Sequence, residues 1–179
     1  MDLAQEFLSC TTDKFHDVKR SAERTMEQLS LEELHRSPSI ESNSIAVIVK
    51  HLCGNMTARW SNFLNSDGEK TDRNRDLEFT GGYKSREELL TSWEEGWDTL
   101  FAALSALGPD DLMKIVTIRN EPHSVLKAIQ RQLSHYSYHV GQIVYVGKQI
   151  KDTSWQCLSV PRGKSEEYTE KVKKYHANS

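Results

Sequence analysis

Two of the seven histidines, His135 and His139, stand four residues apart within a helical pattern of apolar residues. Residues at positions i and i+4 lie on one face of a helix, so both imidazole rings can reach a single ion. Imidazole nitrogens bind zinc, nickel and iron. The pair alone is weak evidence for a metal, because two surface histidines at this spacing are the commoner case.

This histidine pair lies away from the apolar stripe of its own predicted helix. At about 100° per residue, the histidine face also holds Arg131 and Gln142. The apolar stripe lies farther round the helix and consists of Ile129, Leu133, Tyr136, Val140, Ile143 and Val144. The two histidines are therefore predicted to face a cleft or solvent, and not the apolar core.

A third histidine, His51, has a similar place on another predicted helix. His51, Asn55 and Arg59 recur every four residues and flank an apolar stripe. One histidine from this helix and two from the other would give three protein ligands with a position open for water or substrate. That is the pattern of a catalytic metal site, whereas structural sites are closed. The spacing alone leaves a metal site and unrelated histidines equally open.

Three neighbouring polar residues have two interpretations each. Asn55 is one turn from His51 and is predicted to bind at the site; its alternative is a hydrogen bond between helices. Gln142 is one turn beyond His139, and a binding role and a structural role stay equally open. Arg59 could pair with a substrate carboxylate, but a structural role beside the polar loop 67–78 is favoured.

Four long amphipathic segments must position these residues. Helical spacing of apolar residues predicts helices over residues 3–29, 44–64, 85–107 and 124–150. A polar loop follows the second helix, a short extended segment covers residues 112–119, and a small helix is expected over residues 165–175. The pattern predicts an all-α four-helix bundle forming one domain over residues 1–179.

The composition limits which binding partners and which cellular compartment are expected. The 179 residues carry a net charge of −3, which gives no electrostatic reason to expect nucleic acid or an anionic membrane. Neither a secretory signal nor an apolar run of the roughly 20 residues that span a bilayer is visible. Three separated cysteines, Cys10, Cys53 and Cys157, form no disulfide framework and fit a reducing cytoplasm. Cys53 falls within a helical pattern and is expected to be a small buried residue.

Several motifs together resemble one branch of the DinB-like (YfiT-like) superfamily, and the likeness covers most of the chain. They include the residues around the three histidines, the polar loop and a tail segment. In order, these are His51-Leu52-Cys53-Gly54-Asn55-Met56, Arg59-Trp60, Phe63-Leu64, Asp67-Gly68-Glu69-Lys70, Arg73, Arg75, Glu78-Phe79, Arg119-Asn120-Glu121-Pro122-His123-Ser124, His135-Tyr136-Ser137-Tyr138-His139-Val140-Gly141-Gln142-Ile143 and Pro161-Arg162-Gly163-Lys164-Ser165.

The resemblance implies an up-down-down-up four-helix bundle that holds a divalent metal near one end. Its ligands would be His51, His135 and His139, and its metal zinc or nickel, with iron or manganese as alternatives. Several relatives transfer thiols such as bacillithiol, mycothiol or glutathione, and one is a maleylpyruvate isomerase. The resemblance therefore implies a thiol S-transferase with a small-molecule thiol and an electrophile as partners. A non-catalytic metal-binding dimer and a metal-dependent hydrolase are the alternatives.

Because many members of this superfamily are dimers, we expect the chain to form a homodimer. Sedimentation velocity at micromolar concentration should then give a mass near twice the 20.5 kDa of one chain. A mass near 20.5 kDa would contradict the expectation.

Overall fold

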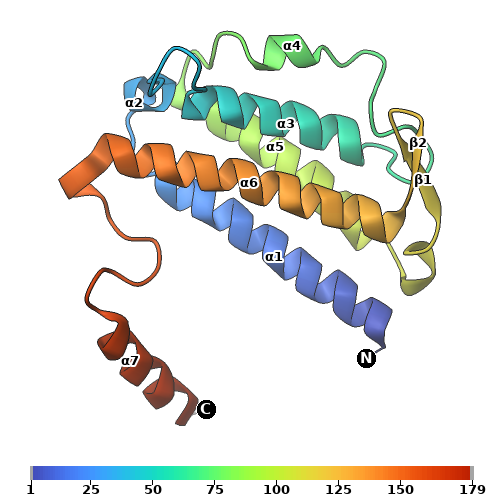
Figure 1. Ribbon diagram of the computed structural model, residues 1–179. Helices are drawn as coiled ribbons and strands as arrows, with labels where there is room; N and C mark the ends of the chain where they lie inside the picture. Colours follow the sequence, from blue (N-terminus) through green and yellow to red (C-terminus); the bar gives the residue numbers. More distant parts are fainter. Residues whose placement is uncertain (1, 178–179) are drawn as a thin grey trace.

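The computed structural model describes the backbone of residues 2–177 and the side chains of residues 2–173. Four long helices pack side by side: α3 lies against α5 and α6, and α1 lies against α6 and α5 (Figure 1). Helix α7 stands apart from the other helices. The elements are α1 (Leu3–Met26), α2 (Leu31–His35), α3 (Ile45–Trp60), α4 (Arg75–Glu78), α5 (Arg86–Ser105), β1 (Ile115–Ile118), β2 (Glu121–Ser124), α6 (Val125–Lys151) and α7 (Ser165–Ala177), with 3₁₀ turns at Pro109–Asp111 and Asp152–Ser154.

Aromatic side chains from all four long helices meet in the core. Phe15 makes edge-on contacts with Trp60 and Trp97, with ring centroids 6.2 and 6.4 Å apart. The Trp60 indole Nε1–H donates a hydrogen bond to Tyr136 Oη at 3.0 Å. Edge-to-face geometry brings the positive ring edge to a negative face, which favours such pairs beyond the area they bury. The core therefore joins α1, α3, α5 and α6 through specific contacts.

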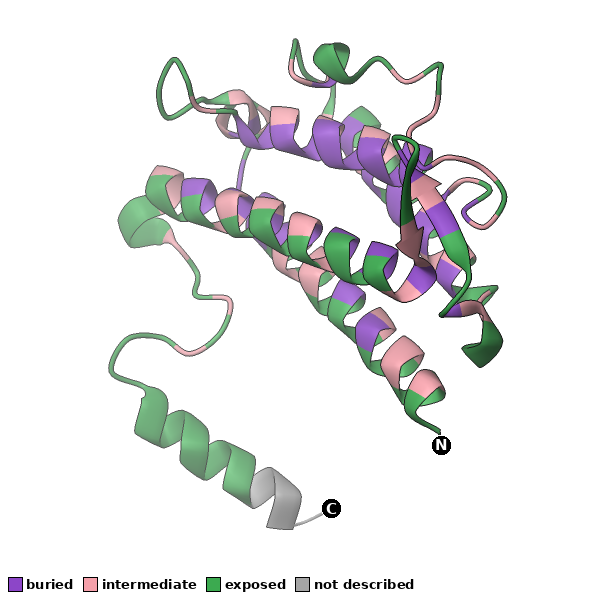
Figure 2. Ribbon diagram, turned by 45° about the vertical axis from the view of Figure 1, so that its right-hand side comes forward, coloured by how far each residue is buried: buried purple, intermediate pink, exposed green. Residues whose placement is uncertain are grey.

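Helix α3 is the most buried element, with twelve of its sixteen residues buried. The segment 61–85, which contains α4, passes over the side of α3 that the other long helices leave open (Figures 1 and 2). As a result the polar face of α3, with His51, Asn55 and Arg59, is buried as well as its apolar face. In the described part of the chain no helix, α3 included, is long and apolar enough to cross a membrane.

Helix boundaries differ from those the sequence predicts at two connections. The second predicted helix, 44–64, ends at Trp60, because Ser61 is extended and Asn62 has a positive φ of 49°. The first, 3–29, ends at Met26, and the connection after it contains the short helix α2. The Ser30 hydroxyl accepts from Glu33 N–H while the Glu33 carboxylate accepts from Ser30 N–H, and this capping box starts α2.

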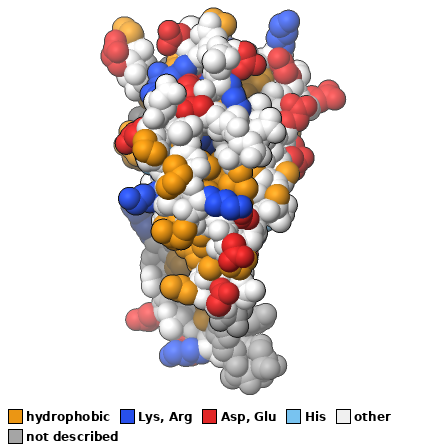
Figure 3. Space-filling model, turned by 90° about the vertical axis from the view of Figure 1, so that its right-hand side faces the viewer, with side chains coloured by type: hydrophobic (Ala, Val, Ile, Leu, Met, Phe, Trp, Pro, Cys, Tyr) orange, Lys and Arg blue, Asp and Glu red, His pale blue; other side chains and the backbone are white. Residues whose placement is uncertain are grey.

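The predicted extended segment 112–119 is one strand of a hairpin, so the fold includes a two-stranded sheet that the prediction lacks. Strand β1 pairs antiparallel with β2, and the two-residue turn between them is Arg119-Asn120. Both turn residues have positive φ, 55° and 62°, the conformation of a type I′ turn that usually contains glycine. Figure 3 shows the end of the molecule that carries the hairpin. Apolar side chains gather near the middle of this face, and charged side chains of both signs surround them.

The Asp67 carboxylate holds this strained turn in place from the loop after α3. It accepts hydrogen bonds from the backbone N–H groups of Arg119 at 2.9 Å, Asn120 at 2.8 Å and Glu69 at 2.7 Å. Burial acts to raise the pKa of Asp67, but these three N–H donors outweigh it and hold that pKa well below its usual range. The loop and the hairpin are thus fixed to each other, although 52 positions separate Asp67 from Arg119.

We expect Asp67→Asn to lower the free energy of unfolding by about 1–3 kcal/mol, because a neutral amide accepts these hydrogen bonds less strongly. Asp67 has a lowered pKa in the folded state, so its contribution is complete above the unfolded pKa of about 4 and is lost as pH falls further. The difference in free energy of unfolding between wild type and variant, measured by urea denaturation, should therefore become smaller below about pH 4. The same substitution at exposed Asp72, in the same loop, is the control; equal effects at both positions would contradict the role of Asp67.

Candidate metal centre

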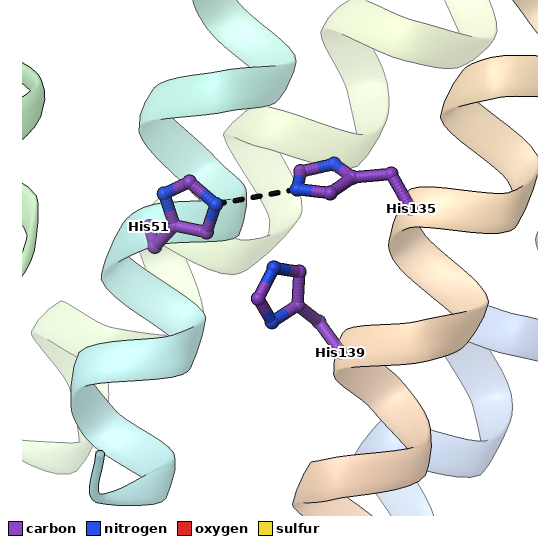
Figure 4. Close-up of side chains that lie close together, drawn as sticks. All are labelled: His51, His135 and His139. Atoms are coloured by element: carbon purple, nitrogen blue, oxygen red, sulfur yellow. Dashed lines mark hydrogen bonds between the residues drawn. The ribbon is translucent and has the colours of Figure 1, made fainter. Parts of the chain in front are cut away.

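The structure brings His51, His135 and His139 together across the gap between α3 and α6 (Figure 4). One ring nitrogen from each histidine lies within 4.8 Å of the other two. The Nε2 atoms of His51 and His135 are 3.3 Å apart. Two ligands about 2.05 Å from a tetrahedral zinc ion are about 3.3 Å from each other, so this pair already has the spacing of neighbouring ligands.

A chain of hydrogen bonds through Glu78 orients His51. Its Nδ1–H donates to Glu78 Oε2 at 2.8 Å, which leaves Nε2 facing the other histidines. Glu78 in turn accepts from Arg73, with Nε to Oε1 at 2.7 Å and Nη2 to Oε2 at 2.8 Å. Burial acts to raise the pKa of Glu78, yet the hydrogen bonds from His51 and Arg73 lower it, so the carboxylate is ionised. A carboxylate that holds the far nitrogen of a histidine is the usual partner of a metal ligand, because it fixes the tautomer and the ring.

Gly54 provides the space that this carboxylate occupies. A Cβ atom at position 54 would overlap the Glu78 Oε1 atom. The position lies inside α3, where glycine costs helix stability relative to alanine. The close approach of Glu78 gives a physical reason for glycine at this position.

The two histidines on α6 differ in what holds them. His139 Nδ1–H donates to Gln142 Oε1 at 2.9 Å, so Gln142 orients His139 as Glu78 orients His51. His135 Nδ1 is buried without a hydrogen-bond partner among the described residues. Burial lowers the pKa of both rings, and the neighbouring histidines add to this, bringing the pKa of His135 to about 3. Both imidazoles are therefore neutral near pH 7, which is the form that binds metals.

A family model for a protein of unknown function, DUF1572, matches residues 2–164. The chain belongs to the DUF1572 family. The matched region contains all three histidines, Glu78 and Arg73, and it ends one residue before α7 begins. No curated protein and no solved structure matches the chain. The family match does not test the resemblance to the DinB-like superfamily, which stays a prediction.

In this DUF1572 chain Asn55 is part of a buried hydrogen-bond network between helices. Its Oδ1 atom accepts from Gln132 Nε2 at 2.7 Å and from Tyr136 Oη at 3.0 Å. That is the alternative interpretation of Asn55. The residue also lines the cavity beside the histidines, so its predicted binding role stays a prediction.

Two adjoining cavities lie at the histidine cluster. The first, of about 620 Å³, is lined by all three histidines and five arginines, and the second, of about 490 Å³, is lined by Ile48, Tyr145 and Val146 among others. Asn43, Tyr138 and Gln142 line both cavities. Cavities of this size accept small molecules. Tyr138 is 65% exposed, and one side of it borders the site.

Sequence reasoning missed the roles of Glu78, Arg73 and Gly54. Glu78 and Arg73 belong to a polar segment with no periodic pattern, and 27 positions separate Glu78 from His51. Their types and spacing therefore carry no signal for a contact with α3. The glycine inside a helical pattern, Gly54, was the one available hint that another group approaches closely there.

Replacing Glu78 with glutamine should weaken metal binding 10- to 100-fold while the protein stays folded. The amide can still accept from His51 Nδ1–H, but it carries no charge to polarise the ring or to pair with Arg73. Competition titrations with a chromophoric zinc chelator would measure the change. Glu95→Gln, at an exposed position of α5, is the matched control and should bind zinc as the wild type does. Unchanged affinity in Glu78→Gln would contradict the role assigned to this carboxylate.

Proposed function

We propose that the protein binds one divalent metal ion through His51, His135 and His139, and that this ion activates a thiol for transfer to an electrophile. The observation that carries the proposal is the convergence of the three ring nitrogens within 4.8 Å. The proposal also includes the finer expectations from the resemblance, which are a DinB-like up-down-down-up topology, a homodimer and a cytoplasmic location.

The side chains present suit a metal of the zinc or nickel type. Imidazole nitrogens are borderline ligands that zinc and nickel bind well, and iron or manganese would be weaker alternatives. His51 and His139 are oriented through their Nδ1 atoms by Glu78 and Gln142, so their Nε2 atoms are directed toward one centre. Three protein ligands leave at least one coordination position for an exogenous molecule, and the larger cavity opens onto that position.

When bound, the ion would lower the pKa of a coordinated thiol and so supply a nucleophile near neutral pH. Two adjoining cavities give space for a thiol and an acceptor on either side of Tyr138 and Gln142. The chain's own cysteines are poorly suited to this step. Burial raises the pKa of Cys53 to about 12, and Cys10 and Cys157 are exposed and lie outside the lining of both cavities.

The lining of the larger cavity favours thiol transfer over hydrolysis. Among the described residues that line it there is no aspartate, glutamate or lysine that could act as a general base toward water. A hydrolase would need such a group within hydrogen-bond reach of the attacking water. A thiol nucleophile needs it less, because its pKa is already lower than that of water.

We expect elemental analysis of the purified protein to give one zinc or nickel ion per chain. His135→Ala and His139→Ala should each lose that ion, because two remaining ligands cannot fix its geometry. His16→Ala, which removes an exposed histidine of α1, is the control and should keep it. Wild-type protein that binds no divalent metal would overturn the proposal.

The same preparations test the reaction. Metal-loaded wild type should conjugate bacillithiol, mycothiol or glutathione to monochlorobimane, the metal-free form should not, and Cys53→Ser should keep the activity. If the metal is bound but none of these thiols reacts, the non-catalytic metal-binding bundle is the better account. If Cys53→Ser keeps metal and fold but loses activity, the nucleophile is a protein thiol.

A further inference from the structure

The larger cavity concentrates positive charge beside the three histidines. Its lining includes five arginines, contributed by α3, the polar loop, α4, the hairpin turn and α6: Arg59, Arg73, Arg75, Arg119 and Arg131. No carboxylate side chain is found among the described residues that line it. Charges of one sign in a recess reinforce one another and raise the local concentration of the opposite ion.

The carboxylates behind the cavity wall compensate only part of this charge. Glu69 alone faces three guanidinium groups: Arg73 Nη1 at 3.2 Å, Arg119 Nε at 3.3 Å and Arg59 Nη2 at 3.7 Å. The Glu78 carboxylate accepts hydrogen bonds from Arg73 and His51. These two carboxylates offset at most two of the three guanidinium charges, so positive charge remains toward the cavity.

Arg59 stands out among the five arginines because its guanidinium group is buried and incompletely hydrogen-bonded. The residue is only 4% exposed, yet its Nε and Nη1 atoms have no hydrogen-bond partner in the described part of the chain. Gly68 makes room for it, because a Cβ atom at position 68 would lie 2.6 Å from Nη1. Burial lowers the pKa of Arg59, which reflects the cost of removing its charge from water. Buried guanidinium groups normally persist only when an anion pairs with them.

We propose that this cavity binds a small molecule carrying a carboxylate or phosphate group, with Arg59 as the buried anchor and Arg131 at the rim. A guanidinium group presents parallel N–H donors that match two oxygens of either anion. Arg131 is suited to the rim because its side chain is 48% exposed and its nearest carboxylate oxygen, on Glu121, is 4.0 Å away. The inference rests on the proposed function for one point only: the reacting end of the anion would lie at the metal site.

Calorimetric titration of metal-free protein tests the anion site by itself. Inorganic phosphate and succinate, used separately at low ionic strength, serve as probes, and the tighter of the two identifies the recognised group. Arg59→Met should bind the tighter probe at least tenfold more weakly, and Arg59→Lys should recover only part of the loss, because lysine keeps the charge without the fork. Arg131→Met, at a partly exposed position that tolerates substitution, should also weaken binding. Arg20→Met on α1 is exposed and should change nothing.

Zinc stoichiometry, measured on the same proteins, separates this inference from the proposed function. Arg59→Met should still bind one zinc ion per chain, since Arg59 is not a ligand. Probe binding without any zinc binding would overturn the proposed function and leave the anion site standing. Zinc binding without saturable probe binding in metal-free wild type would overturn the anion site. So would probe affinity that is the same in wild type and Arg59→Met.

Discussion

The buried chain of contacts from Arg73 through Glu78 to His51 is the interaction on which the site depends. All three side chains are at most 8% exposed, so each would be costly to bury without the others. Together they fasten the segment 61–85 over the polar face of α3. The same contacts set the tautomer of His51, so one buried ionic network both closes the fold on that side and orients a ligand.

A second anchor, Asp67, extends this arrangement to the far end of the bundle. Its carboxylate ties the loop after α3 to the hairpin turn, and Gly68 N–H donates to Thr117 O at 2.8 Å beside it. The hairpin thereby brings Arg119 to the cavity, while α6 brings Arg131 and two histidines. Five separate stretches of chain thus contribute to one wall, and the metal site and the arginine cluster share a single recess.

Apolar periodicity was sufficient to predict the four long helices and the exclusion of His135 and His139 from the apolar core. These features are local, since a helix repeats every 3.6 residues and its faces follow from spacing alone. Periodicity was insufficient for α2, β2 and the end of α3. Strand β2 contains Pro122 and little apolar alternation, and it is a strand because it pairs with β1 while Asp67 holds the turn between them.

The sequence by itself determined which side chains could bind a metal: a helical pair, His135 and His139, and a single His51 on another helix. Only the tertiary structure decided that they meet, because helices α3 and α6 are joined by 64 residues of intervening chain. It also decided that Glu78 orients His51 and that Arg59 is buried beside a cavity without a full partner. Those contacts join a nonperiodic segment to a helix, and contacts of that kind produce no periodic pattern in the sequence.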